Sequence, residues 1–349
     1  MKVKFLQIEK AISAALFVLL LSVAGTKNAL AQNLVATLKH GDDISFYYGS
    51  NALVNAHNDA ETGDIITLSS GSFAPTTITK AITLRGAGCV EDTISGVHPT
   101  VINDNNFTFN VGGDAENHLT VEGIYFSSRT HVQNLSYPKF IKCKFNEIEI
   151  SFNNSGYTYS GYMDNAQFNN CVINNFNFSN ATNSTFVNSV VKDADQLNNS
   201  NRTITAFNSL IGLHRSPSAL TAYNCIFIRI NDLENGTHLA QYSVAYNCIG
   251  IKNNHYSSNV FQVTNFNCME VNNLSDVFET FTFTGNYILN EEIATGFLGN
   301  DGTEVGIHGG TMPYTSRPSY QIVRQYNVPN RSDNEGHLNV GIEVYSEDE

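Results

Sequence analysis

The feature that most constrains the fold is a short unit that returns along the chain, most plainly as Ala-Tyr-Asn-Cys at 222–225 and again at 245–248. A looser form has an aromatic or aliphatic residue, usually an Asn, then Cys or Ser, then an apolar pair. Its Cys or Ser is found at Cys143, Cys171, Ser189, Ser209, Cys225, Cys248 and Cys268, at intervals of 28, 18, 20, 16, 23 and 20 residues. Periods of about 20 residues built from short β runs predict a solenoid, whose turns bury their inner faces by stacking on one another.

The spacing extends toward the N-terminus. Leu68 in "DIITLSSG" and Leu84 in "AITLRGAG" are 16 residues apart, and the strand-like runs "TVIND" and "LTVEGIYF" follow. Leucine-rich repeats have a similar period, but their leucine pattern and helical return are missing here. The chain therefore predicts an all-β, right-handed parallel β-helix of ten to eleven coils.

Alternation within "FIKCKFNEIEISF" at 140–152 predicts which side chains face the core. Successive side chains of a strand point to opposite faces, so the apolar set is expected inside and the lysines and glutamates outside. The apolar set is Ile141, Cys143, Phe145, Ile148, Ile150 and Phe152. Two positions after the Cys or Ser, later units have Ile173, Val191, Ile211, Phe227, Gly250 and Glu270. The last two are not apolar side chains, so the facing of the later coils stays open.

The recurring Asn and Cys each have a physical reason to be there. Asn tolerates the left-handed backbone of a sharp turn, and its amide can form hydrogen bonds up and down a stack of coils. Inward cysteines stacked about 4.8 Å apart would lie slightly beyond the usual Cβ separation of a disulfide. Free buried thiols are the favoured interpretation. The alternative is a bridge, with Cys225–Cys248 or Cys248–Cys268 as the pairs to consider.

Composition and the N-terminus predict an exported protein. Lys2 and Lys4 precede the apolar run "AISAALFVLLLSVAG", and "ALA" at 29–31 offers small residues for cleavage after Ala31. Residues 1–31 are therefore expected to be a signal peptide, and the mature chain a secreted, periplasmic or surface-exposed monomer without a membrane span. The formal charge of −13 makes nucleic acid an unsuitable partner, because phosphate binding needs clustered Lys and Arg.

The start of the mature chain resembles the pectin-lyase-like β-helix superfamily. Ser50 is a candidate N-cap for a short helix with Ala52, Leu53 and Ala56 on its apolar side. A Gly-Asp turn, a strand, a "G-x-F" unit and an "ITL-x-G" strand follow, which is the superfamily's usual opening. The matching residues are Gly63, Asp64, Gly71, Phe73, Ile82, Leu84 and Gly86. The resemblance implies an uncharacterised secreted bacterial β-helix family and a fold, without specifying a reaction.

Polysaccharide lyases of that superfamily need a basic residue as general base and usually carboxylates that hold Ca²⁺. The candidates are Arg215 in "HRSP", Arg229 with Asp232 in "RIND", and Asp193 with Asp195 in "KDAD". Each is an isolated match, as is His308 in "GIHGG", which is more typical of a structural Gly turn. The glycoside hydrolase signatures of the fold are not present in order, since Asp42 and Asp43 precede the first coil. No catalytic, binding or metal residue is assigned, and Ca²⁺ enters only under the lyase alternative.

The sequence thus predicts a β-helix with its N-terminal cap over residues 32–285 and a strand-rich C-terminal cap over 286–349. Strict alternation through Leu338, Val340, Ile342 and Val344 supports strands in that cap. The run "SGYTYSGYMDN" at 155–165 predicts an extra projecting loop rich in Tyr and Asn. We expect a non-catalytic protein that binds glycan or a cell-surface partner, with a polysaccharide lyase or glycoside hydrolase as the alternative.

Overall fold

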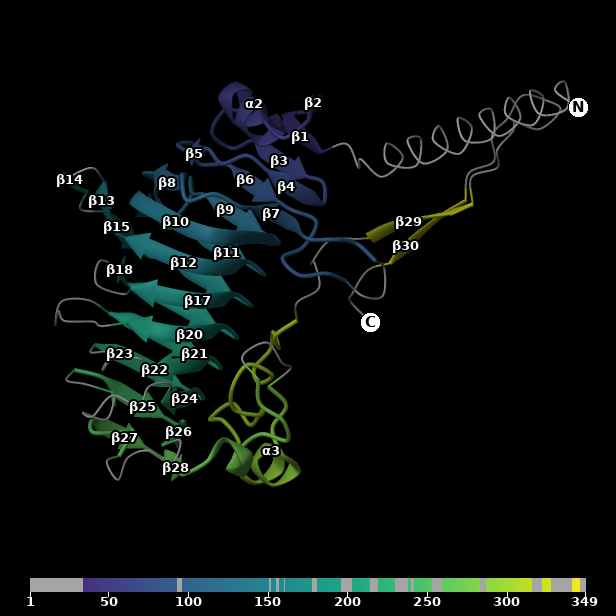
Figure 1. The fold of residues 1–349 in the computed structure, drawn as a ribbon. Helices are drawn as coiled ribbons and strands as arrows, with labels where there is room; N and C mark the ends of the chain where they lie inside the picture. The colour runs from purple at the N-terminus through teal and green to yellow at the C-terminus, as the bar shows by residue number, and fades with distance from the viewer. Residues whose placement is uncertain are drawn as a thin grey trace, which may run out of the picture.

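The computed structural model describes residues 34–92, 96–150, 152–154, 157–159, 161–177, 181–195, 203–213, 219–229, 238–239, 242–252, 259–282, 287–315, 322–327 and 341–345. Over these residues the chain is a parallel β-solenoid (Figure 1). The predicted signal peptide lies outside the described residues. None of the described helices has the length and apolar character needed to cross a membrane.

Two long sheets form the walls. Sheet A has the order β2 (Asp43–Tyr48), β1 (Val35–His40), β3 (Ile65–Leu68), β6 (Thr83–Arg85), β9 (Thr120–Glu122), β11 (Lys139–Ile141), β16 (Gln167–Asn169), β19 (Ser184–Val187), β21 (Ile204–Phe207), β23 (Leu220–Tyr223), β25 (Val244–Tyr246) and β27 (Thr264–Phe266). Sheet B contains β7 (Thr100–Ile102), β10 (Ile124–Ser136), β12 (Lys144–Ile150), β17 (Val172–Asn177), β20 (Val190–Asp195), β22 (Leu210–Leu213), β24 (Ile226–Arg229), β26 (Ile249–Ile251) and β28 (Met269–Val271). Shorter strands extend sheet B, namely β4 (Gly71–Phe73), β5 (Thr77–Ile78), β8 (Phe107–Val111), β15 (Tyr162–Asp164) and β18 (Ala181–Thr182).

About eight turns are regular, from β9–β10 to β27–β28, each with one strand in either sheet. This is fewer than the ten to eleven coils expected. The first turns are less regular. Between β6 and β9 the chain makes a longer excursion, so that Leu84 pairs with Val121, 37 residues further on. From β11 onward the sheet A register follows the predicted spacing, since Phe140 pairs with Phe168 and Phe168 with Phe186.

Each regular turn passes from sheet A to sheet B through one residue with a left-handed backbone. These residues are Gly123, Lys142, Asn170, Asn188, Asn208, Asn224, Asn247 and Asn267, with φ between 45° and 64°. Asn adopts this region more readily than other residues with a side chain, because its short polar side chain bonds locally. This confirms why Asn recurs; we call these positions the left-handed row.

The Cys or Ser that follows satisfies the backbone inside the turn. The Ser189 hydroxyl accepts from the Cys171 N–H (3.0 Å) and donates to the Phe168 or Val187 carbonyl (3.0 and 2.9 Å). Likewise the Cys248 thiol accepts from the Cys225 N–H at 3.4 Å. All six cysteines are free, which confirms the favoured interpretation. A small side chain that both accepts and donates is therefore required at this rung.

The inward rows form a continuous core of apolar side chains. Phe145, Ile173, Val191, Ile211 and Phe227 stand in one row and are all buried. Gly250 and Glu270 continue this row, which settles the facing of the later coils.

The inward orientation predicted for Ile141 is wrong. Phe140 points into the core and stacks on Phe168 at 4.9 Å, whereas Ile141 is half-buried on the outer side. The left-handed backbone of Lys142 interrupts the alternation, so positions before and after it are out of phase. The predictions for Cys143, Phe145, Ile148 and Ile150 are confirmed, and the side chain of Phe152 lies outside the described residues.

A short helix and an antiparallel strand pair close the N-terminal end. Helix α2 (Ala52–Asp59) buries Ala52, Leu53 and Ala56 as predicted, but its N-cap is Asn51 instead of Ser50. Strand β1 pairs antiparallel with both β2 and β3, so β2 runs in the same direction as β3 and the rest of sheet A. The end of the core is therefore covered at this side.

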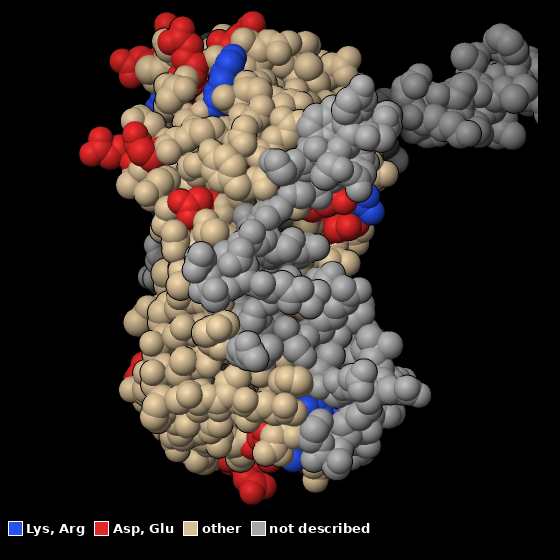
Figure 2. Space-filling view, turned by 90° about the vertical axis from the view of Figure 1, so that its left-hand side faces the viewer, with Lys and Arg blue, Asp and Glu red and all other residues tan. Residues whose placement is uncertain are grey.

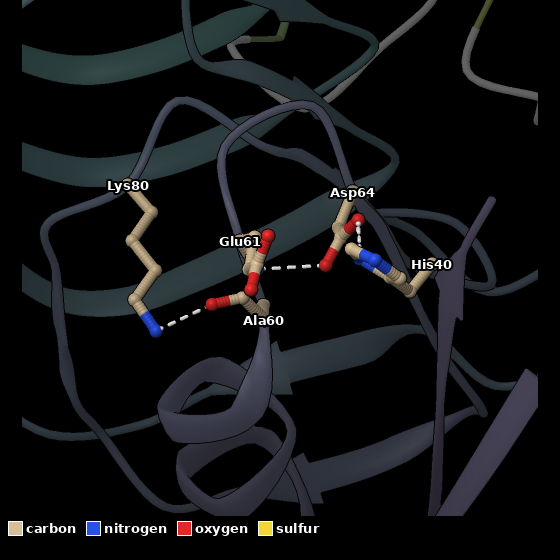
Figure 3. A network of polar contacts seen from close by, with 5 residues as sticks. All are labelled: His40, Ala60, Glu61, Asp64 and Lys80. Atoms are coloured by element: carbon tan, nitrogen blue, oxygen red, sulfur yellow. Dashed lines mark hydrogen bonds and ion pairs between the residues drawn. The ribbon is translucent and has the colours of Figure 1, made fainter.

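Two groups of polar contacts, around Lys80 and around Asp64, fix this cap (Figure 3). The Lys80 ammonium donates to the Ala60 carbonyl at 2.6 Å and also to the carbonyls of His57 and Asn58, which the helix end leaves without partners. Asp64, of the predicted Gly-Asp turn, accepts from the Glu61 N–H at 2.7 Å, and His40 Nδ1 lies 2.9 Å from its other oxygen. These residues have a structural role.

The described residues between 274 and 315 (274–282 and 287–315), which we call the C-terminal segment, lie along the outer side of sheet B, with η2 (Leu274–Asp276) and α3 (Glu291–Gly296) beside the lower turns (Figure 1). The sequence predicted a cap over the end of the core from 286 onward. Two further strands, β29 (Ile322–Asn327) and β30 (Gly341–Tyr345), pair antiparallel as the predicted strand content implies; Leu338 and Val340 lie outside the described residues.

The last turn ends the core with polar side chains. Asn265 stands in the inward row that holds Ala222 and Ala245 in the preceding turns, and it is exposed. Glu270 accepts from the Phe261 N–H at 2.9 Å and pairs with Lys252 at 3.2 Å. Polar atoms at these inward positions lower the apolar area that the end of the stack leaves uncovered.

Candidate functional site

The outer side of sheet A carries two straight rows of side chains over its last five strands. The threonine row is Thr185, Thr205, Thr221, Val244 and Thr264, and the aromatic row is Phe207, Tyr223, Tyr246 and Phe266. All of these side chains are partly or fully exposed, and none is charged. Because strands in a sheet are about 4.8 Å apart, hydroxyl, methyl and ring groups repeat at that spacing. We call this surface the open face.

The rings of the aromatic row are stacked on one another. Phe207 and Tyr223 have centroids 5.1 Å apart, and the next two pairs are 4.9 Å apart, with planes within 10° of parallel. The flat side of each inner ring is therefore covered by its neighbours, and ring edges and the Tyr223 and Tyr246 hydroxyls point outward. Phe266, at the end of the row, is 50% exposed.

The same two rows are charged toward the N-terminus. Above β19 they contain Lys139, Gln167 and Asn169, and an Arg85–Glu122 ion pair of 3.4 Å. The side of the molecule in Figure 2 has most of its Asp and Glu side chains in the upper part, with others at the lower end. The uncharged character of the open face is thus a local property.

The outer side of sheet B carries the clearest charged cluster of the described residues. Arg129 Nε lies 3.0 Å from Glu147 and its Nη1 lies 3.4 Å from Glu149, which is also 3.2 Å from His131 Nδ1. The hydrogen bond that Arg129 donates to the Glu147 carboxylate raises the pKa of Arg129. A general base needs a lowered pKa, so the raised pKa makes Arg129 less suited to accept a proton.

In the lower turns the outer side of sheet B is covered by the chain itself. Its outward residues Val190, Leu210, Ile226, Ile228, Ile249 and Ile251 are buried against Val277, Phe278, Tyr287, Leu289, Ile293, Val305 and Ile307 of the C-terminal segment. Amides of the left-handed row hold that segment in place. Asn188 donates to the Ile307 and Gly309 carbonyls at 2.9 and 2.7 Å, and Asn224 exchanges two hydrogen bonds with Asn300.

The predicted amide contacts between coils are found at other positions. Asn174 donates to Asn146 at 3.2 Å and Asn134 to Asn110 at 3.1 Å, and neither donor belongs to the left-handed row. In the left-handed row, the side-chain amides of Asn170, Asn188 and Asn224 instead form hydrogen bonds to the C-terminal segment.

The lyase candidates from the sequence are not brought together. Arg229 is 2% exposed, stands in the inward row of Leu213, and donates from Nη2 to the Asn259 carbonyl at 2.8 Å. Asp193 is half-buried, outward in the row of Glu147. Asp195 is the last residue of β20, and its side chain lies outside the described residues, as do Arg215 and Asp232. Arg229 is thus enclosed in the wall and cannot reach an external polymer.

The remaining candidates have separate environments. His308 is half-buried in the C-terminal segment, where Glu304 has a pKa raised by burial. The Tyr-rich run at 155–165 contains part of an antiparallel hairpin, β13 (Phe152–Asn154) with β14 (Tyr157–Tyr159), as the extra loop predicted. Tyr162, which follows it, is exposed. No group of three or more His, Cys, Asp or Glu with metal-binding geometry occurs within the described residues.

The open face was missed from the sequence alone. Its signal is the residue before each Asn in "TAFN", "TAYN", "VAYN" and "TNFN", with Thr or Val two positions earlier. The Asn and the Cys or Ser define the period of the repeat, but they do not show on which side of the sheet the preceding aromatic residue lies. Comparison of the chain with protein-family models, with curated proteins and with solved structures finds no match.

Proposed function

We propose that the protein is a non-catalytic binding protein whose open face binds glycan or a partner on a cell surface. The observation that carries the proposal is that, in the same turns, one outer side is covered by the C-terminal segment and the other is exposed. An uncharged, rigid and regularly spaced set of groups suits an extended, neutral ligand more than a polyanion. Membership of the pectin-lyase-like superfamily and export to the cell exterior are part of the proposal.

The chemistry of the rows indicates how such a ligand would be held. Threonine and tyrosine hydroxyls donate and accept hydrogen bonds, and threonine methyls and ring edges supply apolar contact. Because the inner rings are stacked, a sugar would meet their edges, and a flat stacking contact would be limited to Phe266. Binding would therefore depend on several turns at once.

The alternative is a polysaccharide lyase or glycoside hydrolase, with the Arg129 cluster on sheet B as its site. In favour of it, an outward group of carboxylates and a basic residue is what such chemistry requires. Against it, both glutamates are engaged by Arg129, and the raised pKa of Arg129 opposes proton abstraction.

The test uses the purified protein with a panel of neutral and acidic polysaccharides, with and without Ca²⁺. Bound polymer, unsaturated products and new reducing ends are measured in the same samples. We expect binding without product. Calcium-dependent unsaturated product that disappears in Arg129→Ala would replace the proposal with the lyase alternative. Absence of binding to every polysaccharide would exclude the glycan form of the proposal, and a protein-array screen would then test the cell-surface partner.

A further inference from the structure

The two edges of sheet A are unpaired among the described residues and run in the same direction. Strand β2 is the N-terminal edge and β27 the C-terminal edge, and β2 is parallel to β3 and hence to β27. An unpaired edge presents backbone N–H and C=O groups that can pair with another strand. A strand added to either edge in the direction of the sheet would continue it.

The edges also match in their side chains. Phe46 of β2 pairs with Thr37, which pairs with Thr67, so Phe46 stands in the same outward row that ends at Phe266. Phe46 and Phe266 are 58% and 50% exposed, and Ile44 on β2 is 56% exposed. Strands with exposed apolar side chains at an open edge are normally avoided or protected in soluble proteins.

From these observations we infer that copies of this chain associate head to tail, with β27 of one copy pairing in parallel with β2 of the next. In the register that continues the rows, Thr264, Asn265 and Phe266 lie opposite Ile44, Ser45 and Phe46. Phe266 then stacks on Phe46 at the spacing found within the aromatic row. No charged side chain lies in these three pairs, so the contact adds no like-charge repulsion of its own.

The rest of the two ends is compatible with this contact. Helix α2 lies beside β1 and β2 at the N-terminal end of the solenoid (Figure 1), and its width of about 10 Å is about what two strands span. Its exposed residues include Asn55 and Asn58, which in this arrangement would face the exposed Asn265 of the last turn. Amides meet amides there, and each can donate and accept. The inference differs from the monomer that the sequence predicts.

The test exploits the polarity of a head-to-tail contact. Phe46→Lys blocks only the N-terminal edge and Phe266→Lys only the C-terminal edge, so each retains one intact edge, and in a mixture the two altered edges carry like charges and repel each other. Sedimentation velocity of the wild-type protein should show dimers and longer species that increase with concentration. They should also increase with salt, because the net charge of −13 is then screened. Each variant alone should weaken association by about 10-fold or more, as expected for a central apolar anchor.

An equimolar mixture of the two variants should form dimers and nothing longer, because only one productive contact is available. The matched control is Phe207→Lys, which changes an exposed ring of the same row away from either edge. It should associate like the wild type. A wild-type protein that stays monomeric at every concentration and salt, a mixture that fails to pair, or a loss of association in Phe207→Lys would each overturn the inference. Phe46→Ser and Phe266→Ser repeat the test if a charged variant lowers the melting temperature. Polysaccharide binding is read separately, so the two proposals can fail independently.

Discussion

The two outer sides of the lower turns differ although the same repeat builds both. On sheet B the outward row is aliphatic and buried under the C-terminal segment, whereas on sheet A the outward rows are Thr and aromatic and remain exposed. Each buried aliphatic side chain contributes about 1.5–3 kcal/mol when it is removed from water. Burial of sheet B therefore stabilises the fold, while the exposed aromatic row obtains only part of that gain. This difference is what makes the open face a candidate for binding.

The largest expected loss of stability comes from a substitution on the covered outer side of sheet B. Ile226→Ala removes a side chain that is 2% exposed between sheet B and the C-terminal segment, and should lower the free energy of unfolding by about 3 kcal/mol. Tyr223→Ala, on the opposite side of the same turn, should cost about 1 kcal/mol because only stacking is lost. Urea unfolding of both variants measures the contrast. Equal losses would mean that the open face is also covered.

A smaller effect is expected from the amides that hold the C-terminal segment. Asn188→Ala removes two hydrogen bonds and puts Ala into a left-handed backbone, for an expected loss of about 2–3 kcal/mol. Asn188→Gly keeps the backbone and should lose only the hydrogen-bond part. The control is Asn247→Ala, in the same row, where the backbone preference alone should cost about 1 kcal/mol. If both alanine variants lose the same stability, the amides do not hold the segment.

The repeat itself made most of the fold predictable. The intervals between Cys143 and Cys268 are those of the sheet register, and the Asn positions are those of the left-handed turns. The facing of Ile141 was wrong because a single left-handed residue shifts the phase of alternation, and alternation alone cannot locate that residue.

The position of the C-terminal segment was less predictable, because it depends on contacts more than 100 residues apart. Asn188 binds the carbonyls of Ile307 and Gly309, and the "GIHGG" run that contains them predicts a turn without indicating this distant partner. The residues of the open face belong to the repeat, but only the strand register of sheet A shows that they lie in continuous rows. Arg229 illustrates the opposite case, since a motif-based candidate proved to be enclosed in the wall.

The interior rung common to both sides should respond less than the covered side. Ser189→Ala removes the acceptor of the Cys171 N–H and should cost about 1–2 kcal/mol. Its effect concerns the turn, so binding by the open face should be unchanged in the folded protein. Native thiol titration should detect Cys268, which is half-exposed, ahead of the five buried cysteines. Fast reaction of all six thiols before unfolding would contradict the rung geometry.

The smallest effect lies in the N-terminal cap, away from both sides. Burial, and then the charge of Lys80, lower the pKa of His57 in the folded protein. The unfolded chain therefore binds more protons below its ordinary pKa of about 6.5, and this contribution to stability decreases as the pH falls through that value. Urea midpoints from pH 7.5 to 5 for the wild type and His57→Gln measure it. A pH slope that His57→Gln leaves unchanged would assign the dependence to other groups.

The most direct test of the account compares polysaccharide binding by variants of the two outer sides. The double variant Tyr223→Ala with Tyr246→Ala changes the open face, and Glu147→Gln with Glu149→Gln changes the charged cluster of sheet B. With any polysaccharide that the wild type binds, we predict that the first pair of changes weakens binding by about 10-fold or more and that the second leaves it unchanged. Loss of binding in the glutamine variant with retention in the alanine variant would contradict the assignment of binding to the open face.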